Sequence, residues 1–158
     1  MNPVKLGLAR LGDAPRIAAM SRDLIETGLP WTWTPKRVAA HIKERENLAV
    51  IATVERELVG FVLAQFGAER VHLALLSVAE ARRRQGVGRR LVRWIEESAV
   101  VAGLFLMRLE VRATNRQARR FYATLGYTES GVIPLYYSGM EDAIQFSRDL
   151  RLLAAGNA

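Results

Sequence analysis

The chain has 158 residues, of which half are hydrophobic and a quarter are charged, a composition typical of a single globular domain spanning residues 1–158. It contains no Cys and no apolar run of about 18 residues, which excludes disulfides, thiolate metal sites, Cys nucleophiles and membrane-spanning helices. The formal net charge of +7 favours an anionic partner, either a phosphorylated cofactor or a nucleic acid, although an Arg-biased coding sequence can also produce it.

The first half of the chain predicts one strand, two helices and three further strands. Residues 4–9 alternate weakly, as a strand does, and residues 13–28 carry an apolar stripe at helical spacing. After a loop at 29–33, Thr34 caps a short helix that has Pro35 at its first position. Three strands follow, at residues 48–54, 58–65 and 71–78. Short turns join these strands, so we expect them to be antiparallel.

The second half predicts helices and strands in alternation. A helix at 86–102 is followed by a strand at 104–111 and by a helix at 115–125 that Gly126 closes. The first of these helices is expected to bury Val87, Leu91, Trp94, Ile95 and Ser98. Two last strands lie at 127–137 and 140–150. The fold class is α/β (α+β), a mixed and mostly antiparallel sheet of about seven strands flanked by four helices.

The clearest chemical signal lies at residues 82–90, where five Arg flank Gln85, Gly86, Val87 and Gly88. This stretch follows an apolar strand and opens an amphipathic helix. A helix N-terminus leaves its first N–H groups unpaired and carries about half a positive charge, and glycine lets an anion come close. The stretch therefore predicts a cradle for a pyrophosphate, with an Arg-rich solvated helix start as the alternative. Its spacing fits neither a nucleotide-triphosphatase phosphate loop nor a dinucleotide fingerprint.

The pattern of Arg83, Gly86 and Gly88 after a strand resembles the acetyl-CoA signature of the GNAT superfamily of N-acetyltransferases. Residues 109–127 resemble the later strand–helix block of that superfamily, and the order of elements matches along nearly the whole chain. The last third, including residues 136–143, is similar to the ribosomal-protein alanine N-acetyltransferases. The resemblance implies a GNAT-type fold and an enzyme that transfers an acetyl group from acetyl-CoA to a primary amine.

The resemblance also implies which residues hold acetyl-CoA (coenzyme A). They are Leu76, Ser77, Val78, Arg83, Arg84, Gln85, Gly86, Val87, Gly88, Arg89, Asn115 and Ala118. Backbone N–H groups near Val78 would bind the pantetheine arm and polarise the thioester carbonyl, a role typically worth about 10²–10³ in rate. Asn115 also suits a helix N-cap, and both roles can hold because they use different atoms. No metal is expected.

Tyr122 matches the superfamily's general acid, which protonates the departing thiolate; the alternative is a core tyrosine. The base is left open between Glu110 and His72. Glu110 lies in the resembling motif, and His72 lies near the place where other members carry a catalytic Glu. An imidazole with a pKa of about 6.5 suits the task, yet a strand His is more often structural. A third alternative needs no base, because an α-amine has a pKa of only about 7.7–8.0.

We expect the acceptor to be the N-terminal α-amine of a protein or peptide, with a small-molecule amine as the alternative. Tyr136 and Tyr137 would wall the acceptor groove on one side, and Trp31 and Trp33 on the other, unless the tryptophans only pin their loop to the core. A nucleic-acid-binding module is disfavoured, because the basic residues gather at a glycine cradle. A non-catalytic acyl-CoA sensor is disfavoured by Tyr122.

The expected partners are therefore acetyl-CoA and an amine acceptor, with no nucleic acid and no membrane, and a homodimer is left open. Residues 1–10 do not resemble a signal peptide, so we expect a cytoplasmic protein.

Overall fold

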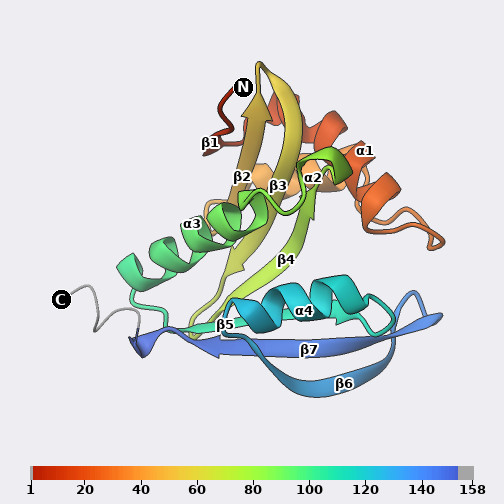
Figure 1. Cartoon of the computed structure of the whole chain (residues 1–158), viewed down its shortest axis with the longest axis vertical. Coiled ribbons are helices and arrows are strands. Elements are labelled where there is room, and N and C mark those ends of the chain that lie inside the picture. Colours follow the sequence, from red (N-terminus) through yellow and green to blue (C-terminus); the bar gives the residue numbers. More distant parts are fainter. Residues whose placement is uncertain (1, 153–158) are drawn as a thin grey trace.

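The computed structural model describes residues 2–152, which form one seven-stranded sheet with helices on both faces (Figure 1). The sheet order is β1-β2-β3-β4-β5-β7-β6, and β4 with β5 is its parallel pair. The elements are β1 (Lys5–Leu8), α1 (Ala14–Leu24), α2 (Pro35–Lys43), β2 (Asn47–Val54), β3 (Glu57–Phe66), β4 (Val71–Val78), α3 (Val87–Val101), β5 (Leu106–Arg112), α4 (Arg116–Thr124), β6 (Thr128–Tyr137) and β7 (Glu141–Asp149). The predicted fold class, a mixed and mostly antiparallel sheet with four helices, is confirmed. No helix within residues 2–152 is long and apolar enough to cross a membrane.

Local signals in the sequence set the helix ends and the last turn. At the start of α2 the Thr34 hydroxyl accepts a hydrogen bond from the Arg37 amide at 3.3 Å. At the start of α4 the Asn115 side chain accepts one from the Ala118 amide at 3.0 Å. Gly126 closes α4 with a left-handed φ of 93°, where a Cβ would be unfavourable. The predicted caps are therefore confirmed.

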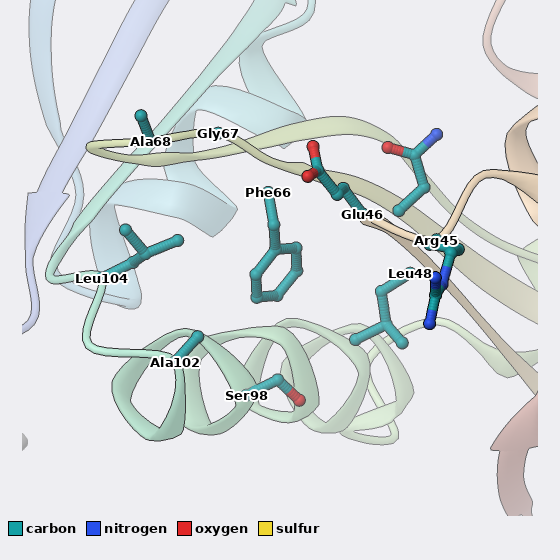
Figure 2. Close-up of a pocket in the computed structure, with 10 residues that line it drawn as sticks. Arg45, Glu46, Leu48, Phe66, Gly67, Ala68, Ser98, Ala102 and Leu104 are labelled. Carbon is teal, nitrogen blue, oxygen red and sulfur yellow. The ribbon is translucent and has the colours of Figure 1, made fainter.

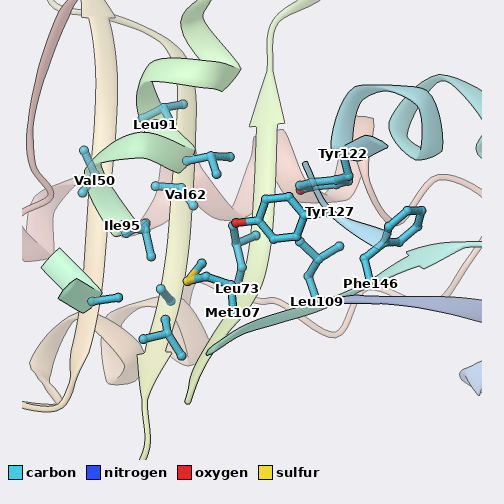
Figure 3. Close-up of a cluster of buried hydrophobic side chains, with 14 of the residues drawn as sticks. Val50, Val62, Leu73, Leu91, Ile95, Met107, Leu109, Tyr122, Tyr127 and Phe146 are labelled. Atoms are coloured by element: carbon cyan, nitrogen blue, oxygen red, sulfur yellow. The ribbon is translucent and has the colours of Figure 1, made fainter. Parts of the chain in front are cut away.

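The core forms two layers, one on each face of the sheet. Helices α3 and α4 cover one face, where Leu91 and Ile95 lie against strand residues such as Val50 and Val62 (Figure 3). Helices α1 and α2 cover the other face over β2, β3 and β4. Each fully buried Leu or Ile contributes about 1.5–3 kcal/mol relative to an exposed one. The sheet is therefore held from both sides.

The buried stripe of α3 differs from the predicted one. Val92 and Ala99 are fully buried, whereas Trp94 and Ser98, which we expected to be buried, are only half-buried. The reason is that Trp94 and Ser98 border open hollows in the surface, so their edge of the stripe faces solvent. The stripe is centred about one residue further round the helix than the sequence spacing indicated.

Strands β4 and β5 pair only over a short stretch and then separate. Their pairing joins residues Val71, His72 and Leu73 to Met107, Arg108 and Leu109. Beyond Leu73, Ala74 forms a bulge against β3, and the remaining residues of β4 have no strand partner on the β5 side within the described structure. β5 continues beside β7 instead. The last residues of β4 therefore keep unpaired backbone groups on one edge, and these lead to residues 82–90.

A buried carboxylate ties α3 to the C-terminal half of the sheet. Glu96 on α3 is only 4% exposed, and it accepts hydrogen bonds from the Tyr127 hydroxyl and from Arg148 Nη1, each at 2.8 Å. Burial and the charge of Glu96 raise the pKa of Tyr127 above its usual range, so its hydroxyl stays a donor. A buried charge of this kind is tolerated because both of its partners are in place.

Candidate active site

Residues 82–90 wrap from the end of β4 to the start of α3. Arg84 and Gly86 take left-handed φ values of 62° and 81°, and α3 begins at Val87. The first backbone bond at this end of α3 joins the Arg90 amide to the Gly86 carbonyl at 3.0 Å. The amides of residues 86–89 make no backbone hydrogen bond within the described structure. They form the set of free donors that an anion at a helix N-terminus requires.

The two glycines of this segment have different roles. A Cβ placed on Gly86 would meet no atom within 4 Å, so open space lies in front of the helix start. A Cβ placed on Gly88 would come within 3.1 Å of Phe121 Cζ on α4. Gly88 therefore allows α3 and α4 to pack closely, and Gly86 keeps the approach to the free amides open.

The arginines around these amides leave the segment positively charged. Arg83 Nε donates to the Val78 carbonyl at 3.1 Å, and Arg90 Nη1 donates to the Val4 carbonyl at 3.1 Å. Arg84 and Arg89 are exposed. Within residues 2–152 none of the arginines in residues 82–90 forms a salt bridge to a carboxylate. Free amides, open space and unneutralised arginines together fit a phosphorylated ligand.

The unpaired edge of β4 runs from this cradle towards Tyr122. Leu76 and Val78 pack towards the α3 and α4 core, whereas Ser77 is buried in the strand. At the start of α4 the side-chain oxygen Oδ1 of Asn115 caps the helix, so the side-chain NH₂ group of Asn115 stays available for a ligand. Ala118 follows one turn later and is half-buried. The predicted cofactor residues therefore lie along one path from the helix start to α4.

Tyr122 lies at the inner end of that path and is 5% exposed. Its ring contacts Phe121, Tyr127 and Phe146 at centroid distances of 5.1, 5.6 and 6.0 Å. Its hydroxyl makes no hydrogen bond to any described residue. Burial, and to a lesser degree Tyr137, raises the pKa of Tyr122 well above its usual range, so the phenol keeps its proton at alkaline pH. Tyr122 is thus a proton donor without a partner.

The two candidate bases, His72 and Glu110, lie side by side. His72 Nε2 donates to Glu110 Oε1 at 2.6 Å, although the residues are 38 positions apart. His72 Nδ1 lies 3.3 Å from the side-chain oxygen of Gln65, the residue opposite on β3. The Tyr136 hydroxyl donates to the same Glu110 oxygen at 3.1 Å. The structure therefore joins the alternatives left open by the sequence into one hydrogen-bonded group.

Electrostatics keep the Glu110 carboxylate charged. Burial raises the pKa of Glu110, but hydrogen bonds and charge from His72, with hydrogen bonds from Tyr136 and Gln145, outweigh it and hold the pKa below its usual value. Burial and the negative charge of Glu110 in turn raise the pKa of Tyr136 to about 12. At neutral pH the group is therefore a carboxylate that receives two donors.

A bulge in β6 delivers Tyr136 to Glu110. Residues 134–136 have no partners on β7 between the Ile133–Ala143 and Tyr137–Glu141 pairs. Leu135 takes a left-handed φ of 51°, and its amide donates to Asp142 Oδ1 at 2.9 Å. This strained turn was not predicted, because Leu is an unusual residue at positive φ. Tyr137 follows and lies half-buried, close enough to Tyr122 to affect its pKa.

Arg112, which was not singled out from the sequence, fastens the loop after α1 to β5. Its Nη1 donates to the carbonyls of Ile25 and Thr27 at 3.2 and 2.7 Å, and its Nη2 pairs with Glu141. Arg112 lies two residues after Glu110 and so projects from the same face of the strand. That spacing was the signal that could have identified it as part of the acceptor side.

The two tryptophans of the loop differ in exposure. Trp33 is 9% exposed and packs edge-on against His41 of α2, with ring centroids 5.9 Å apart. Trp31 is 38% exposed, and its Nε1 donates to the Ala18 carbonyl at 3.2 Å. Buried Glu26 holds the loop by accepting hydrogen bonds from the amides of Thr32 and Trp33. Trp31 thus offers a ring to the surface, whereas Trp33 mainly pins the loop.

A surface hollow elsewhere on the molecule contains none of the predicted catalytic or binding residues. It has a volume of about 610 Å³ and lies at the far end of α3 from residues 82–90 (Figure 2). Phe66, Leu48 and Leu104 supply apolar walls, and Arg45 and Glu46 lie at its rim. None of the predicted site residues borders this hollow, so it is not part of the candidate site.

Residues 18–127 match the acetyltransferase (GNAT) family, and the matched segment includes both the cradle and the strand–helix block with Glu110 and Tyr122. The chain belongs to the GNAT family. It is an acyl-CoA-dependent N-acetyltransferase, and acetyl-CoA is its co-substrate, as the sequence predicted.

Relatives with named activities are similar along most of this GNAT chain. A [ribosomal protein bS18]-alanine N-acetyltransferase of Escherichia coli is 31% identical over 115 residues, 71% of this chain and 77% of the relative. An N-alpha-acetyltransferase of Sulfurisphaera tokodaii is 28% identical over 148 residues, 85% of this chain and 86% of the relative. An uncharacterized N-acetyltransferase of Methanocaldococcus jannaschii is 33% identical over 99 residues, 62% of this chain and 64% of that relative.

The GNAT fold is also seen in solved structures. The structure of Arabidopsis thaliana NAA60 in complex with acetyl-CoA superposes with a TM-score of 0.83 at 17% identity, covering 94% of this chain and 99% of that chain. At this identity the likeness concerns the fold.

Proposed function

We propose that this GNAT enzyme acetylates the N-terminal α-amine of a protein or peptide. The observation that carries the proposal is the Glu110 group, in which His72 and Tyr136 both bind one carboxylate oxygen. A carboxylate held in this way suits an ammonium group entering from the α1 and α2 face. The relatives named for N-alpha and ribosomal-protein alanine acetylation lend support to a peptide acceptor.

In the proposed binding mode acetyl-CoA lies across the α3 and α4 face. The amides of residues 86–89 would hold its pyrophosphate, and Arg84 and Arg89 would reach its other phosphate. The free edge of β4 near Val78 would bind the pantetheine arm, together with the Asn115 amide. When bound, acetyl-CoA supplies a thioester carbonyl and a thiolate leaving group.

The chemistry then requires two proton movements on opposite faces of the sheet. On the acceptor face, Glu110 orients the amine, and His72 receives the proton that the amine loses as its nitrogen forms a bond to the acetyl carbon. On the other face, Tyr122 donates its hydroxyl proton to the sulfur as the carbon–sulfur bond breaks. The free amides of β4 stabilise negative charge on the carbonyl oxygen. After product release His72 gives its proton to water and the Tyr122 phenolate takes one back, which restores the free enzyme and completes the proton balance.

Three sources of the base remain within this proposal. His72 offers an imidazole, Glu110 is held ionised, and the α-amine itself is partly neutral near pH 8. Because the pKa of Glu110 lies below its usual value, we assign Glu110 to orienting the amine and His72 to receiving the proton. The cytoplasmic location expected from the sequence stays a prediction, and so do the absence of a nucleic-acid partner and the open question of a homodimer.

The test is an acceptor panel with acetyl-CoA and a measurement of thiol release. The panel contains short peptides with different first residues, peptides blocked at the N-terminus, polyamines, aminoglycosides and free amino acids. We expect the best unblocked peptide to have the highest kcat/KM, and blocked peptides to give no thiol. A small amine that exceeds the best peptide more than tenfold, about 1.4 kcal/mol of transition-state preference, would replace this proposal by the small-molecule alternative.

A further inference from the structure

A guanidinium is held rigidly at the mouth of the acceptor side. The Arg37 guanidinium carbon lies 3.8 Å from the centre of the Trp33 ring. That ring is fixed in turn, because Trp33 is 9% exposed, donates its amide to Glu26 at 3.2 Å and packs against His41. Stacking on an aromatic face orients a guanidinium and restricts its rotamers, while its edge stays free to bind. Arg37 is therefore an exposed charge on a rigid platform.

Contacts of the loop that carries Trp33 tie this exposed guanidinium to the strand of Glu110. Arg112, two residues after Glu110 on β5, donates to the carbonyls of Ile25 and Thr27. Glu26 between them accepts from the amide of Trp33, on whose ring Arg37 stacks. In keeping with this placement, burial and Glu110 raise the pKa of Tyr136 overall, although the positive charge of Arg37 lowers it. Tyr136 itself donates to Glu110 at 3.1 Å. An acceptor whose amine meets Glu110 would thus have its following residues within reach of Arg37.

The charges around Glu110 are not balanced within the described structure. Arg37 forms no salt bridge to any residue of 2–152, and Arg108, on the same strand face as Glu110, has a buried Nε with no hydrogen-bond partner. By contrast, Arg22 lies over Trp31 at 5.1 Å but pairs with Asp23 at 2.8 Å. The edge of a guanidinium can bind a carboxylate through two parallel hydrogen bonds. Arg37 has no carboxylate partner of this kind among residues 2–152.

We infer that Arg37 binds a carboxylate of the acceptor, so that this enzyme favours N-terminal sequences with Asp or Glu within the first four residues. The inference rests on the proposed function, because it needs a peptide whose α-amine lies at Glu110. An extended chain spans at most about 3.3–3.6 Å per residue, so residues two to four lie at most roughly 3–11 Å beyond the first residue. The acidic side chain of the acceptor peptide would pair with the Arg37 guanidinium and neutralise its charge.

The experiment compares peptides that differ only by Glu or Gln at position two, three or four. For the wild-type enzyme we expect kcat/KM to be about five to ten times higher with Glu at one or more of these positions, mainly through KM, and the preference to shrink as salt is added. Arg37→Gln should make the paired peptides equal. Arg37→Glu should reverse the order and favour Lys over Glu at the same position.

Arg22→Gln is the matched control, because it removes an arginine that also stacks on a tryptophan of this loop but already has a carboxylate partner. It should keep the preference for Glu. The KM for acetyl-CoA and the melting temperature of each variant report on cofactor binding and folding. Equal rates for Glu and Gln peptides in the wild type, or a preference that survives Arg37→Gln, overturn this inference alone. Turnover of small amines with no peptide acetylated overturns the proposed function and this inference together.

Discussion

At the scale of single residues, the site separates two kinds of proton chemistry. Tyr122 is buried among aromatic rings with no hydrogen-bond partner in the described structure, whereas Glu110 receives two donors. Burial therefore makes Tyr122 hold its proton, and donors make Glu110 hold its charge. These opposite environments support the proposed roles, with Tyr122 as the acid and Glu110 on the acceptor side.

The first prediction concerns the acidic limb of the pH profile. Because the pKa of Glu110 lies below its usual value, Glu110 is ionised throughout the neutral range. A decrease of kcat/KM as the pH is lowered from about 8 to 6 would therefore report the protonation of another group. We expect Glu110→Gln to lower kcat/KM at every pH while keeping this limb. His72→Gln should remove the limb if the imidazole accepts the proton. A limb that both variants keep belongs to the acceptor amine, and His72 would then only position Glu110.

The second prediction concerns the acid. Tyr122→Phe should lower kcat by about 10²–10⁴, the usual contribution of a positioned proton donor. Because the hydroxyl bonds to no described residue, the ring packing survives, and we expect the unfolding free energy to change by less than about 0.5 kcal/mol. The KM for acetyl-CoA should stay nearly the same. Pre-steady-state measurement of the acetyl-transfer step checks the rate, and an unchanged rate would make Tyr122 a core residue.

At the scale of elements, the backbone at the start of α3 has the features that an anion site requires. The amides of residues 86–89 are free, and Gly86 adopts a left-handed φ of 81° with open space where its Cβ would project. Any side chain introduced at this position would project into that space. Gly88 is a poorer place for such a test, since a Cβ there would meet Phe121.

The third prediction therefore uses Gly86→Asp and Gly86→Asn. Asn and Asp tolerate a left-handed φ better than other residues and have nearly the same size, so the pair differs mainly in charge. We expect Gly86→Asp to bind acetyl-CoA at least tenfold more weakly than Gly86→Asn, as measured by calorimetric titration. Gly103→Asp is the control, with a φ of 78° and open space at the other end of the helix, and it should bind normally. Equal affinities for the two Gly86 variants would mean that phosphate lies elsewhere.

Elements set by local signals could be predicted from the sequence, and the contacts between them could not. The strand Val71–Val78 and the caps at Thr34 and Asn115 were correct because each depends on neighbouring residues. The contact of His72 with Glu110 depends on the register of two parallel strands that are far apart in the chain. The bulge at Leu135 depends on Asp142 across the hairpin. Register and bulges arise from tertiary packing, which a pattern of residue types does not record.

At the scale of the whole molecule, the cofactor helix and the last strand are joined through a buried charge. The fourth prediction is that Arg148→Met lowers the free energy of unfolding by about 2–4 kcal/mol, because Glu96 would stay buried with only Tyr127 as partner. Glu96→Gln should cost less, since its side chain still accepts from Tyr127. In the double variant the two losses should not add, and urea unfolding measures each value. Fully additive losses would show that the pair does not interact.

The separation of β4 and β5 also determines the order of events. In the proposed binding mode the cofactor lies on the α3 and α4 face and the amine meets Glu110 and His72 on the α1 and α2 face, so the two substrates would approach from opposite sides of one sheet. They can meet only while both are bound, and no Cys is present to carry the acetyl group between them. Initial-rate plots at several fixed concentrations should therefore intersect rather than run parallel. Desulfo-CoA should compete with acetyl-CoA but not with the amine, because each substrate has its own entrance.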